Sequence, residues 1–451
     1  MLKTTPITFA TAAALAAASP TIASIDPVLT ILPPSPVAPG GFGLCDIANN
    51  RVLVGNPAFV SPLGNRGALY VFDATTGDLL AEFADVDQHP EFDFGAQFFL
   101  AGDTAANVIS ERESIARRDV FTFNVATNTQ GPILNPRRPL DAGGGNTGFA
   151  FFGNTAQDQG LLAVGAHRAY ESTDNFVTET NGAIHIFDLN TLEASRTITL
   201  DPVPVFDDRR DFAEVVDVQD GRVISTYFPD RGPLRFVIFD AATGDLIDEF
   251  DALPELTREF PTITPLLGTS IIAAIARTIE VPCGPCIIDI NSRGLRGLVG
   301  RDGEPIIGGV ALEDDVLAVI EGDFLSADPP TVHLFETDNA IHFASFEVES
   351  RGAPTLWSLA IDNHTLAVGG TTSSVDTSSG AVYVYDISQL PRPCSPADQA
   401  PPFGELNPED TQAFIDSFLN FLTPGDLAPP FGIRDLTDVD TFITAFLAGC
   451  L

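Results

Sequence analysis

The sequence contains a single lysine, Lys3, and its 23 basic residues are outnumbered by 61 acidic ones, for a formal net charge of −38. Without lysine beyond residue 3, neither a Schiff-base mechanism nor a P-loop lysine can operate in the main body of the chain. The shortage of positive charge argues against binding to nucleic acid or to an anionic membrane surface. No later segment offers ~18 uncharged apolar residues, so no membrane-spanning helix is predicted.

The first residues have the composition of a targeting segment. Lys3 precedes an apolar, alanine-rich run at 7–18, and Thr21-Ile22-Ala23 supplies a small-residue cleavage site. This order is typical of a secretory signal peptide, here residues 1–23. The alternative is a buried N-terminal helix. We therefore expect a secreted, extracellular protein that can associate with the cell surface.

The five cysteines are compatible with an oxidising compartment. Because the number is odd, at least one is unpaired or pairs between chains. Cys283-Gly284-Pro285-Cys286 has the spacing of a redox tetrapeptide, but the β-rich run that follows it favours a structural disulfide between Cys283 and Cys286 in a hairpin. Cys45 is predicted to be a buried free thiol, although its fate stays open.

The main feature of the chain is an internal repeat. The segment 67–80 reads GALYVFDATTGDLL, and parts of it return at 182–188, 236–246 and 380–386. In each copy an apolar run ends on an acidic or amide residue. These end positions are 47 to 64 residues apart: Asp73, Asn124, Asp188, Asp240, Asp289, Glu336 and Asp386. Short β-rich runs separated by Gly, Asn and Asp turns are typical of propeller blades, so we predict an all-β, seven-bladed β-propeller.

The two ends of the repeat region indicate how the ring closes. The last unit stops near Leu390, before two prolines, and lacks a fourth strand. Residues 27–32 resemble the fourth strand of other units, such as 196–200. We predict that 27–32 completes the last blade and that the propeller spans residues 24–390, which leaves no open sheet edge at the junction.

Three motifs of the repeat resemble the FG-GAP family. They are Phe42-Gly43, the strand Leu-x-Val-Gly as at 162–165, and Gly-Ala-Val-Tyr-Val-Tyr at 380–385. The resemblance implies a seven-bladed propeller like that of integrin α-chain heads, and it carries no catalytic residues. Family members often hold calcium in Asp-x-Asp-x-Asp-Gly loops, and the sequence has no such loop.

The C-terminal residues 391–451 form a second, different repeat. The segment 398–404 (DQAPPFG) returns 28 residues later at 426–432 (DLAPPFG), and each copy precedes a predicted helix. The apolar residues Phe414, Ile415, Phe418, Leu419 and Leu422 lie on one helical face, and the second helix repeats the pattern. Two short helices bury little surface, so we predict that Cys394 and Cys450, which bracket the module, form a stabilising disulfide.

This tail resembles the GC-type dockerin family, named for the terminal Gly449-Cys450. The resemblance implies a module that docks its carrier to a cohesin-like or other cell-surface receptor. Phe403 and Phe431, at the tips of the two loops, are the predicted docking surface. Ordinary dockerins bind calcium in EF-hand-like loops. The residues that could bind it here are Asp398, Asp410, Asp426, Asp435 and Asp438. Alanine and proline occupy other ligand positions, so calcium is expected to bind weakly or not at all, and the aspartates can equally be helix caps.

No catalytic motif and no cofactor is predicted. The chain lacks a Gly-x-Ser-x-Gly elbow and any Cys/His metal spacing, and His185 and His333 share the repeat position of Tyr70, which favours packing. We predict a non-catalytic binding or display protein whose longest insertion, 170–180, is a candidate recognition loop. The alternative is an extracellular hydrolase or lyase on the same scaffold, and paired acidic residues with perturbed pKa in the central channel would favour it. The propeller ligand and the oligomeric state are not predicted.

Overall fold

The fold was analysed in a computed structural model of the whole chain. The structure describes residues 25–34, 42–60, 66–84, 94, 98–110, 118–134, 148–173, 176–179, 182–200, 212–213, 216–227, 234–251, 263–268, 271–276, 286–290, 295–297, 310–313, 315–321, 329–337, 340–348, 354–372, 380–419, 425–428 and 434–450. The predicted signal peptide lies outside these residues, as do Cys283 and Phe431.

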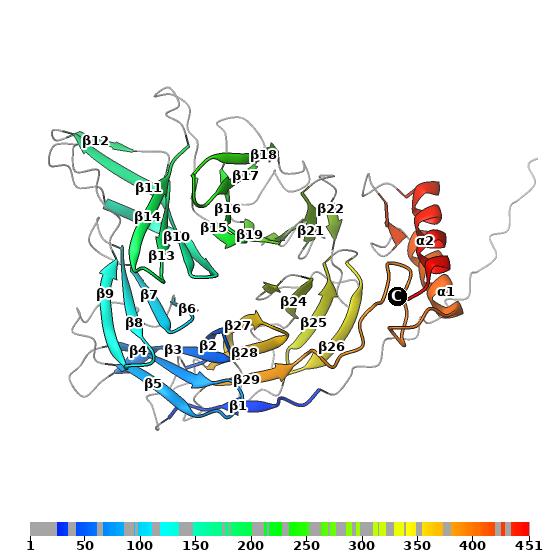
Figure 1. Ribbon diagram of the computed structural model, residues 1–451, viewed down its shortest axis with the longest axis horizontal. Helices are drawn as coiled ribbons and strands as arrows, with labels where there is room; N and C mark the ends of the chain where they lie inside the picture. The colour runs from blue at the N-terminus through cyan, green and yellow to red at the C-terminus, as the bar shows by residue number, and fades with distance from the viewer. Residues whose placement is uncertain are drawn as a thin grey trace, which may run out of the picture.

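The described strands form seven antiparallel sheets arranged radially around one axis, which is the predicted seven-bladed β-propeller (Figure 1). The innermost strands are β2 (Leu44–Ala48), β6 (Phe98–Ala101), β10 (Gly148–Asp158), β15 (Val216–Gln219), β19 (Ile263–Leu267), β23 (Val310–Glu313) and β27 (Pro354–Asp362). The second strands are β3 (Arg51–Val60), β7 (Thr104–Ser110), β11 (Leu161–Thr173), β16 (Arg222–Tyr227), β20 (Ile271–Ala276), β24 (Val316–Glu321) and β28 (Thr365–Thr372). The third strands are β4 (Arg66–Asp73), β8 (Arg118–Asn124), β13 (Ala183–Asp188), β17 (Arg235–Asp240), β21 (Cys286–Asp289), β25 (Thr331–Glu336) and β29 (Ala381–Asp386). The outer strands are β5 (Leu79–Ala84), β9 (Thr129–Leu134), β14 (Glu193–Ile198), β18 (Leu246–Asp251), β22 (Leu295–Gly297), β26 (His342–Glu347) and β1 (Leu29–Ile31).

The repeated acidic or amide residue of the sequence marks the end of the third strand in every blade. Within the described residues, its side chain accepts hydrogen bonds from the backbone of the turn that follows in five of the seven blades. Asp73 Oδ1 accepts hydrogen bonds from the backbone N–H groups of Thr75 and Thr76, at 2.8 and 2.9 Å. Asp240 does the same for the two residues at 242 and 243. The repeat is therefore a turn signal, because a short carboxylate or amide can bond to its own downstream backbone.

The hydrophobic core lies between the blades. Seven clusters of buried side chains each combine residues from two neighbouring blades. Phe42, Phe94 and Phe212, which begin units in the sequence, are 2%, 4% and 0% exposed and fill three of these junctions. Burial of one such ring contributes about 3 kcal/mol, so the phenylalanines help to set the angle between blades.

An N-terminal strand closes the ring. β1 pairs with β29, with Thr30 opposite Tyr383, and so supplies the fourth strand of the seventh blade. The innermost strands of the first and seventh blades, β2 and β27, also contact each other. The backbones approach closely at this junction, because a Cβ atom added to Gly369 would lie 1.7 Å from the carbonyl oxygen of Gly43.

The third blade carries the predicted insertion as a strand extension. β11 continues beyond its neighbours and pairs with an additional short strand, β12 (Phe176–Glu179), with Tyr170 opposite Glu179. This hairpin projects beyond the rim of the propeller (Figure 1). The described residues of the insertion are therefore paired antiparallel strands.

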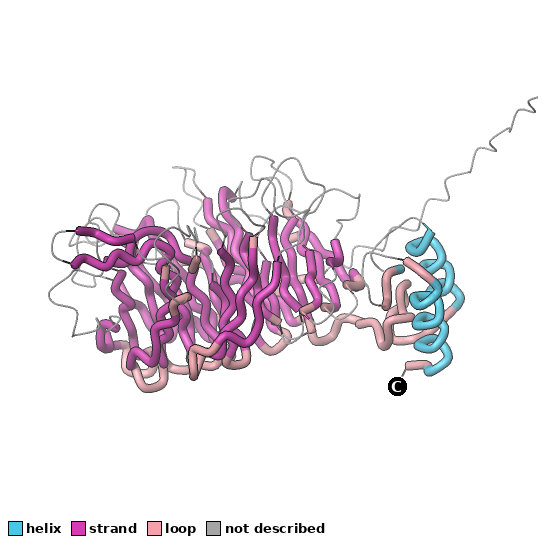
Figure 2. Tube along the Cα trace, turned by 90° about the horizontal axis from the view of Figure 1, so that it is seen from above, coloured by secondary structure: helices cyan, strands magenta, loops and turns pink. Residues whose placement is uncertain are grey.

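Two helices follow the propeller, α1 (Pro408–Leu419) and α2 (Leu436–Ala448), and they stand beside the disc formed by the blades (Figure 2). The rings of Phe414 and Phe442, which correspond in the 28-residue repeat, stack with their centroids 4.2 Å apart. Cys394 and Cys450 form a disulfide that joins the start of the module to its end. No helix in the described part of the chain is long and apolar enough to cross a membrane.

Candidate functional site

The two loops that resemble calcium loops are held by aspartates bonded to the backbone. Asp410 Oδ1 accepts hydrogen bonds from the N–H groups of Gln399 and Ala400, both at 2.8 Å, and its Oδ2 accepts one from Asn407. Asp438 repeats this pattern 28 residues later, with three backbone donors at 2.8 Å. Both carboxylates are 0% exposed. Three charge-assisted bonds satisfy each buried carboxylate, so each loop is organised by the protein's own amides.

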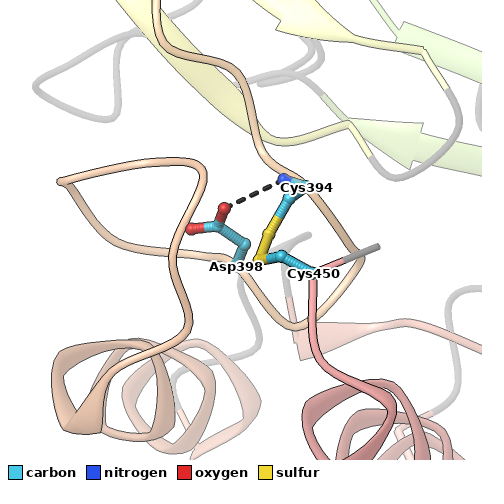
Figure 3. Close-up of side chains that lie close together, drawn as sticks. All are labelled: Cys394, Asp398 and Cys450. Atoms are coloured by element: carbon cyan, nitrogen blue, oxygen red, sulfur yellow. Dashed lines mark hydrogen bonds between the residues drawn. A yellow bond between two sulfur atoms is a disulfide. The ribbon is translucent and has the colours of Figure 1, made fainter.

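Asp398 and Asp426, which occupy the first ligand position of each loop, are also buried. Asp398 Oδ2 accepts hydrogen bonds from the N–H groups of Cys394 and Gly404 at 2.9 and 2.6 Å, whereas its Oδ1 has no hydrogen-bond partner (Figure 3). Burial raises the pKa of Asp398, and these backbone bonds oppose the shift. Asp435 is exposed and caps α2 through the N–H of Thr437, which lowers its pKa. The structure thus places these five aspartates, and the expectation that calcium binds weakly or not at all stays a prediction.

The exposed faces of the two helices differ from the sequence expectation. Ile415 and Leu419 belong to the apolar helical face that the sequence indicates, yet they are 43% and 66% exposed. Their counterparts in the second copy, Ile443 and Leu447, are 48% and 80% exposed. The core of the module is built around the stacked rings of Phe414 and Phe442, with Ala397 buried beside them and partly buried apolar side chains packed at its edge, so Ile415 and Leu419 are left outside it. The module therefore presents the same apolar pair twice.

The module is attached to the sixth blade by its first residues. Arg392 Nη1 lies 2.7 Å from Asp315 Oδ2, and its guanidinium carbon lies 5.6 Å from the centre of the Phe343 ring. Phe403 is half-buried and packs against the core cluster shared by the sixth and seventh blades. In this structure Phe403 therefore contacts the propeller, and its predicted docking role is not established. Phe431 lies outside the described residues.

The other predicted cysteine pair cannot be assessed, because Cys283 lies outside the described residues. Cys286 begins strand β21, as the β-rich run after the tetrapeptide suggested. Cys45 is buried and free, and burial raises its pKa to about 12. A thiol with so high a pKa is unreactive at neutral pH.

An acidic cavity of about 410 Å³ occupies the centre of the propeller, lined mainly by the innermost strands. Among the described residues, its charged lining side chains are all acidic: Asp46, Asp158, Asp217, Glu313 and Asp362. Burial, the largest cause, raises the pKa of both Asp46 and Asp217 to about 7. The charges of Asp362 and Asp158, respectively, raise these two pKa values further. Both carboxyl groups therefore titrate near neutral pH.

The cavity carboxylates also join neighbouring blades. Asp46 Oδ2 accepts a hydrogen bond from the N–H of Leu100 on the second blade, at 2.8 Å. Asp217 Oδ2 accepts one from Leu267 on the fifth blade, at 2.5 Å. The same type of bond to the next blade is made by three further acceptors: Asp158 to Asp220, Glu313 to Asn363, and Asp362 to Asn49. Bonding one blade to the next is therefore a sufficient reason for these acidic side chains, with no catalytic role needed.

A group of three titratable side chains lies in the sixth blade. His333 is 1% exposed, with Nε2 2.7 Å from Glu321 Oε2 and Nδ1 3.2 Å from His342 Nε2. Burial, aided by the charge of His333, lowers the pKa of His342 to about 4. Burial likewise lowers the pKa of His185 to about 4. Sequence reasoning anticipated packing for His185 and His333, but it missed the Glu321–His333–His342 contacts, because they require the register of three strands.

Comparison with known proteins gives a fold likeness only. No family model matches the chain, and no curated protein matches its sequence. Among solved structures, the crystal structure of BamB from Moraxella catarrhalis is similar at 14% identity, with a TM-score of 0.37 over 77% of this chain and 84% of that one. The FG-GAP and dockerin resemblances thus find no support in these comparisons. From its own strand pairings, the chain is a mostly β protein, a seven-bladed β-propeller followed by two C-terminal helices.

Proposed function

We propose that the protein is a non-catalytic binding or display protein, in which the propeller is the displayed scaffold and the C-terminal module docks to a receptor protein. The observation that carries the proposal is the duplicated, exposed apolar pair, Ile415 with Leu419 on α1 and Ile443 with Leu447 on α2. Apolar side chains that repeat on the outside of a small module mark an interaction surface more strongly than scattered ones.

The net negative charge of the C-terminal module indicates the surface charge of the receptor that it would bind. Between residues 394 and 451 the sequence has nine acidic residues and one basic residue, Arg434. A complementary partner therefore offers an apolar surface with a basic rim, because matched charge speeds and orients association. A cohesin-like receptor is one candidate of this class. The contacts of Arg392 and Phe403 attach the module to the propeller, and both helices stand beside the disc (Figure 2).

Export to the cell surface is part of the proposal. The N-terminal segment 1–23, the disulfide between Cys394 and Cys450, and the net charge of −38 support it. Cell fractionation with an antibody against the propeller tests this part, and a chain that stays inside the cell with residues 1–23 retained contradicts it.

The docking surface is tested by affinity capture with the full-length chain. Immobilised wild-type protein is exposed to the exported proteins of its host. A variant with Ile415→Asp, Leu419→Asp, Ile443→Asp and Leu447→Asp is treated alike, and we expect it to lose the captured receptor. The matched control carries Leu79→Asp and Leu80→Asp, which are 41% and 43% exposed on the propeller rim. This control should keep the receptor, and equal capture by all three proteins would refute the docking surface.

A hydrolase or lyase active in the central cavity is the second candidate. The raised pKa values of Asp46 and Asp217 favour it, because a carboxyl group that titrates near neutral pH can act as a general acid. A screen of glycan, peptide and ester substrates compares wild type with Asp46→Asn and Asp217→Asn. Turnover that both variants abolish while remaining folded would favour this candidate over binding alone.

A further inference from the structure

The disulfide of the C-terminal module lies against a buried carboxylate. The sulfur atoms of Cys394 and Cys450 and a carboxylate oxygen of Asp398 all lie within 4.8 Å of one another (Figure 3). Cys450 is exposed and Cys394 is half-buried, so a reductant can reach the sulfur atoms, whereas Asp398 is 0% exposed. The three side chains come from the first loop of the module and from the segment after α2.

Only one of the two carboxylate oxygens of Asp398 accepts hydrogen bonds. The N–H groups of Cys394 and Gly404 both bond to Oδ2, which fixes the carboxylate beside the disulfide. Its other oxygen, Oδ1, is buried without a hydrogen-bond partner. A buried carboxylate oxygen with no partner is costly unless something else binds it.

We propose that Cys394, Cys450 and Asp398 form a zinc site when the disulfide is reduced. Two thiolates and a carboxylate are zinc ligands, and three protein ligands leave the fourth tetrahedral position to water. Two such ligands on one zinc ion are about 3.8 Å apart, given Zn–S bonds of ~2.3 Å. The Cα atoms of the cysteines are 5.2 Å apart, so the thiolates reach this spacing by side-chain rotation.

The chemistry of the conversion balances with a dithiol as reductant. The dithiol gives two electrons and two protons to the disulfide between Cys394 and Cys450 and becomes a disulfide itself. Zinc then displaces the two thiol protons, which pass to water, and binds the two thiolates with ionised Asp398. The ends of the module are therefore joined in both redox states, by a covalent bond or by the metal.

The repeat supplies a matched control for the carboxylate. Asp426 is the counterpart of Asp398 and is 3% exposed, but the second copy has Leu422 where the first has Cys394. The Asp398→Asn and Asp426→Asn variants therefore disturb equivalent loops, and only one of them removes a proposed ligand.

The experiment uses the full-length chain with Cys283→Ser and Cys286→Ser, which removes the other close cysteine pair. The protein is reduced, freed of reductant under argon and titrated with Zn²⁺ by calorimetry, and with Co²⁺ to observe thiolate charge-transfer absorption. We expect one zinc ion per chain and cobalt bands that require both thiolates. Asp398→Asn should weaken the zinc affinity by at least about tenfold, since even outer-shell changes cost 10–100-fold.

The controls separate the outcomes. Asp426→Asn should bind zinc like the parent, and Cys394→Ser with Cys450→Ser should bind none at this site. Oxidised protein should bind none either. The absence of a stoichiometric zinc site in the reduced parent would overturn the proposal, as would equal zinc affinities for Asp398→Asn and Asp426→Asn. Circular dichroism of the parent and of every variant, recorded before the titration, identifies any variant that fails to fold, and zinc affinities are compared only among proteins with the spectrum of the parent.

Discussion

Replacing Asp217 by asparagine should change how the stability of the propeller depends on pH. Asp217 lines the central cavity, and burial raises its pKa to about 7 from an ordinary value of 3.8. A carboxyl group with a raised folded-state pKa favours folding at low pH, and this stability is lost as the pH rises toward 7. The wild-type propeller should therefore become less stable between pH 5 and pH 8.

The size of this loss of stability follows from the difference between the folded-state and unfolded-state pKa values of Asp217. Between pH 5 and a folded-state pKa of about 7, two pH units correspond to about 3 kcal/mol for one group. Because Asp217 is half-buried and water screens part of the effect, we expect about 1 to 3 kcal/mol. Asp46 has a similarly raised pKa and contributes independently from another blade. Asp217→Asn should remove about half of the loss of stability between pH 5 and pH 8. The same substitution should weaken the backbone hydrogen bonds that Leu267 and Val218 donate to this side chain.

The assay is thermal unfolding of the full chain at pH 5 and pH 8, monitored by near-ultraviolet circular dichroism. The quantity compared is the difference in midpoint between the two pH values, which should shrink in Asp217→Asn. Asp245→Asn, an exposed carboxylate in the same blade, should leave that difference unchanged. The exposed turn carboxylates Asp73 and Asp240 have lowered pKa values, so their contribution changes only below about pH 4. A midpoint difference that is the same in Asp217→Asn and wild type would refute the reasoning.

Three further predictions concern packing and the C-terminal module. Gly369→Ala should destabilise the junction of the first and seventh blades by about 3 kcal/mol or more, because its Cβ would overlap the carbonyl oxygen of Gly43. In the control Gly221→Ala the new Cβ meets nothing within 4 Å, so this variant should lose only about 1 kcal/mol, for its positive φ. Urea unfolding measures the free energy of unfolding of both variants. Asp438→Leu leaves three backbone N–H groups without an acceptor and should cost about 3 kcal/mol or more, seen as faster amide exchange in that loop but not in the propeller. Phe403→Ala should loosen the contact between module and propeller, so that limited proteolysis cuts faster in the segment 390–398 with no change in the propeller midpoint.

The blade count and the third strands could be predicted because they depend on local signals. Each third strand ends on an acidic or amide residue, and in five blades, as with Asp73 and Asp240, its side chain caps the next turn. The closing strand could be predicted from its likeness to other outer strands. These features need no knowledge of which blades face each other.

The cavity and the exposed helix faces could not be predicted in the same way. Asp46 and Asp217 acquire their raised pKa values only when the innermost strands converge on one axis, and nothing in their local sequence indicates this. Helical periodicity places Ile415 and Ile443 on the same apolar face as the phenylalanines, because it measures the width of the apolar stripe and not the area that the partner helix can cover. The Phe414–Phe442 stack uses only part of that stripe.

The pairing of β1 with β29 has a consequence for the order in which the chain matures. Thr30 meets Tyr383, which is synthesised 353 residues later. At ~5–20 residues per second, the N-terminal strand waits about 20 to 70 s for its partner. Ring closure is thus the most non-local step of assembly, and until β29 has been made, β1 has no partner strand and can pair with another exposed edge. The time between synthesis of the two ends is therefore the period in which this propeller most needs protection from aggregation.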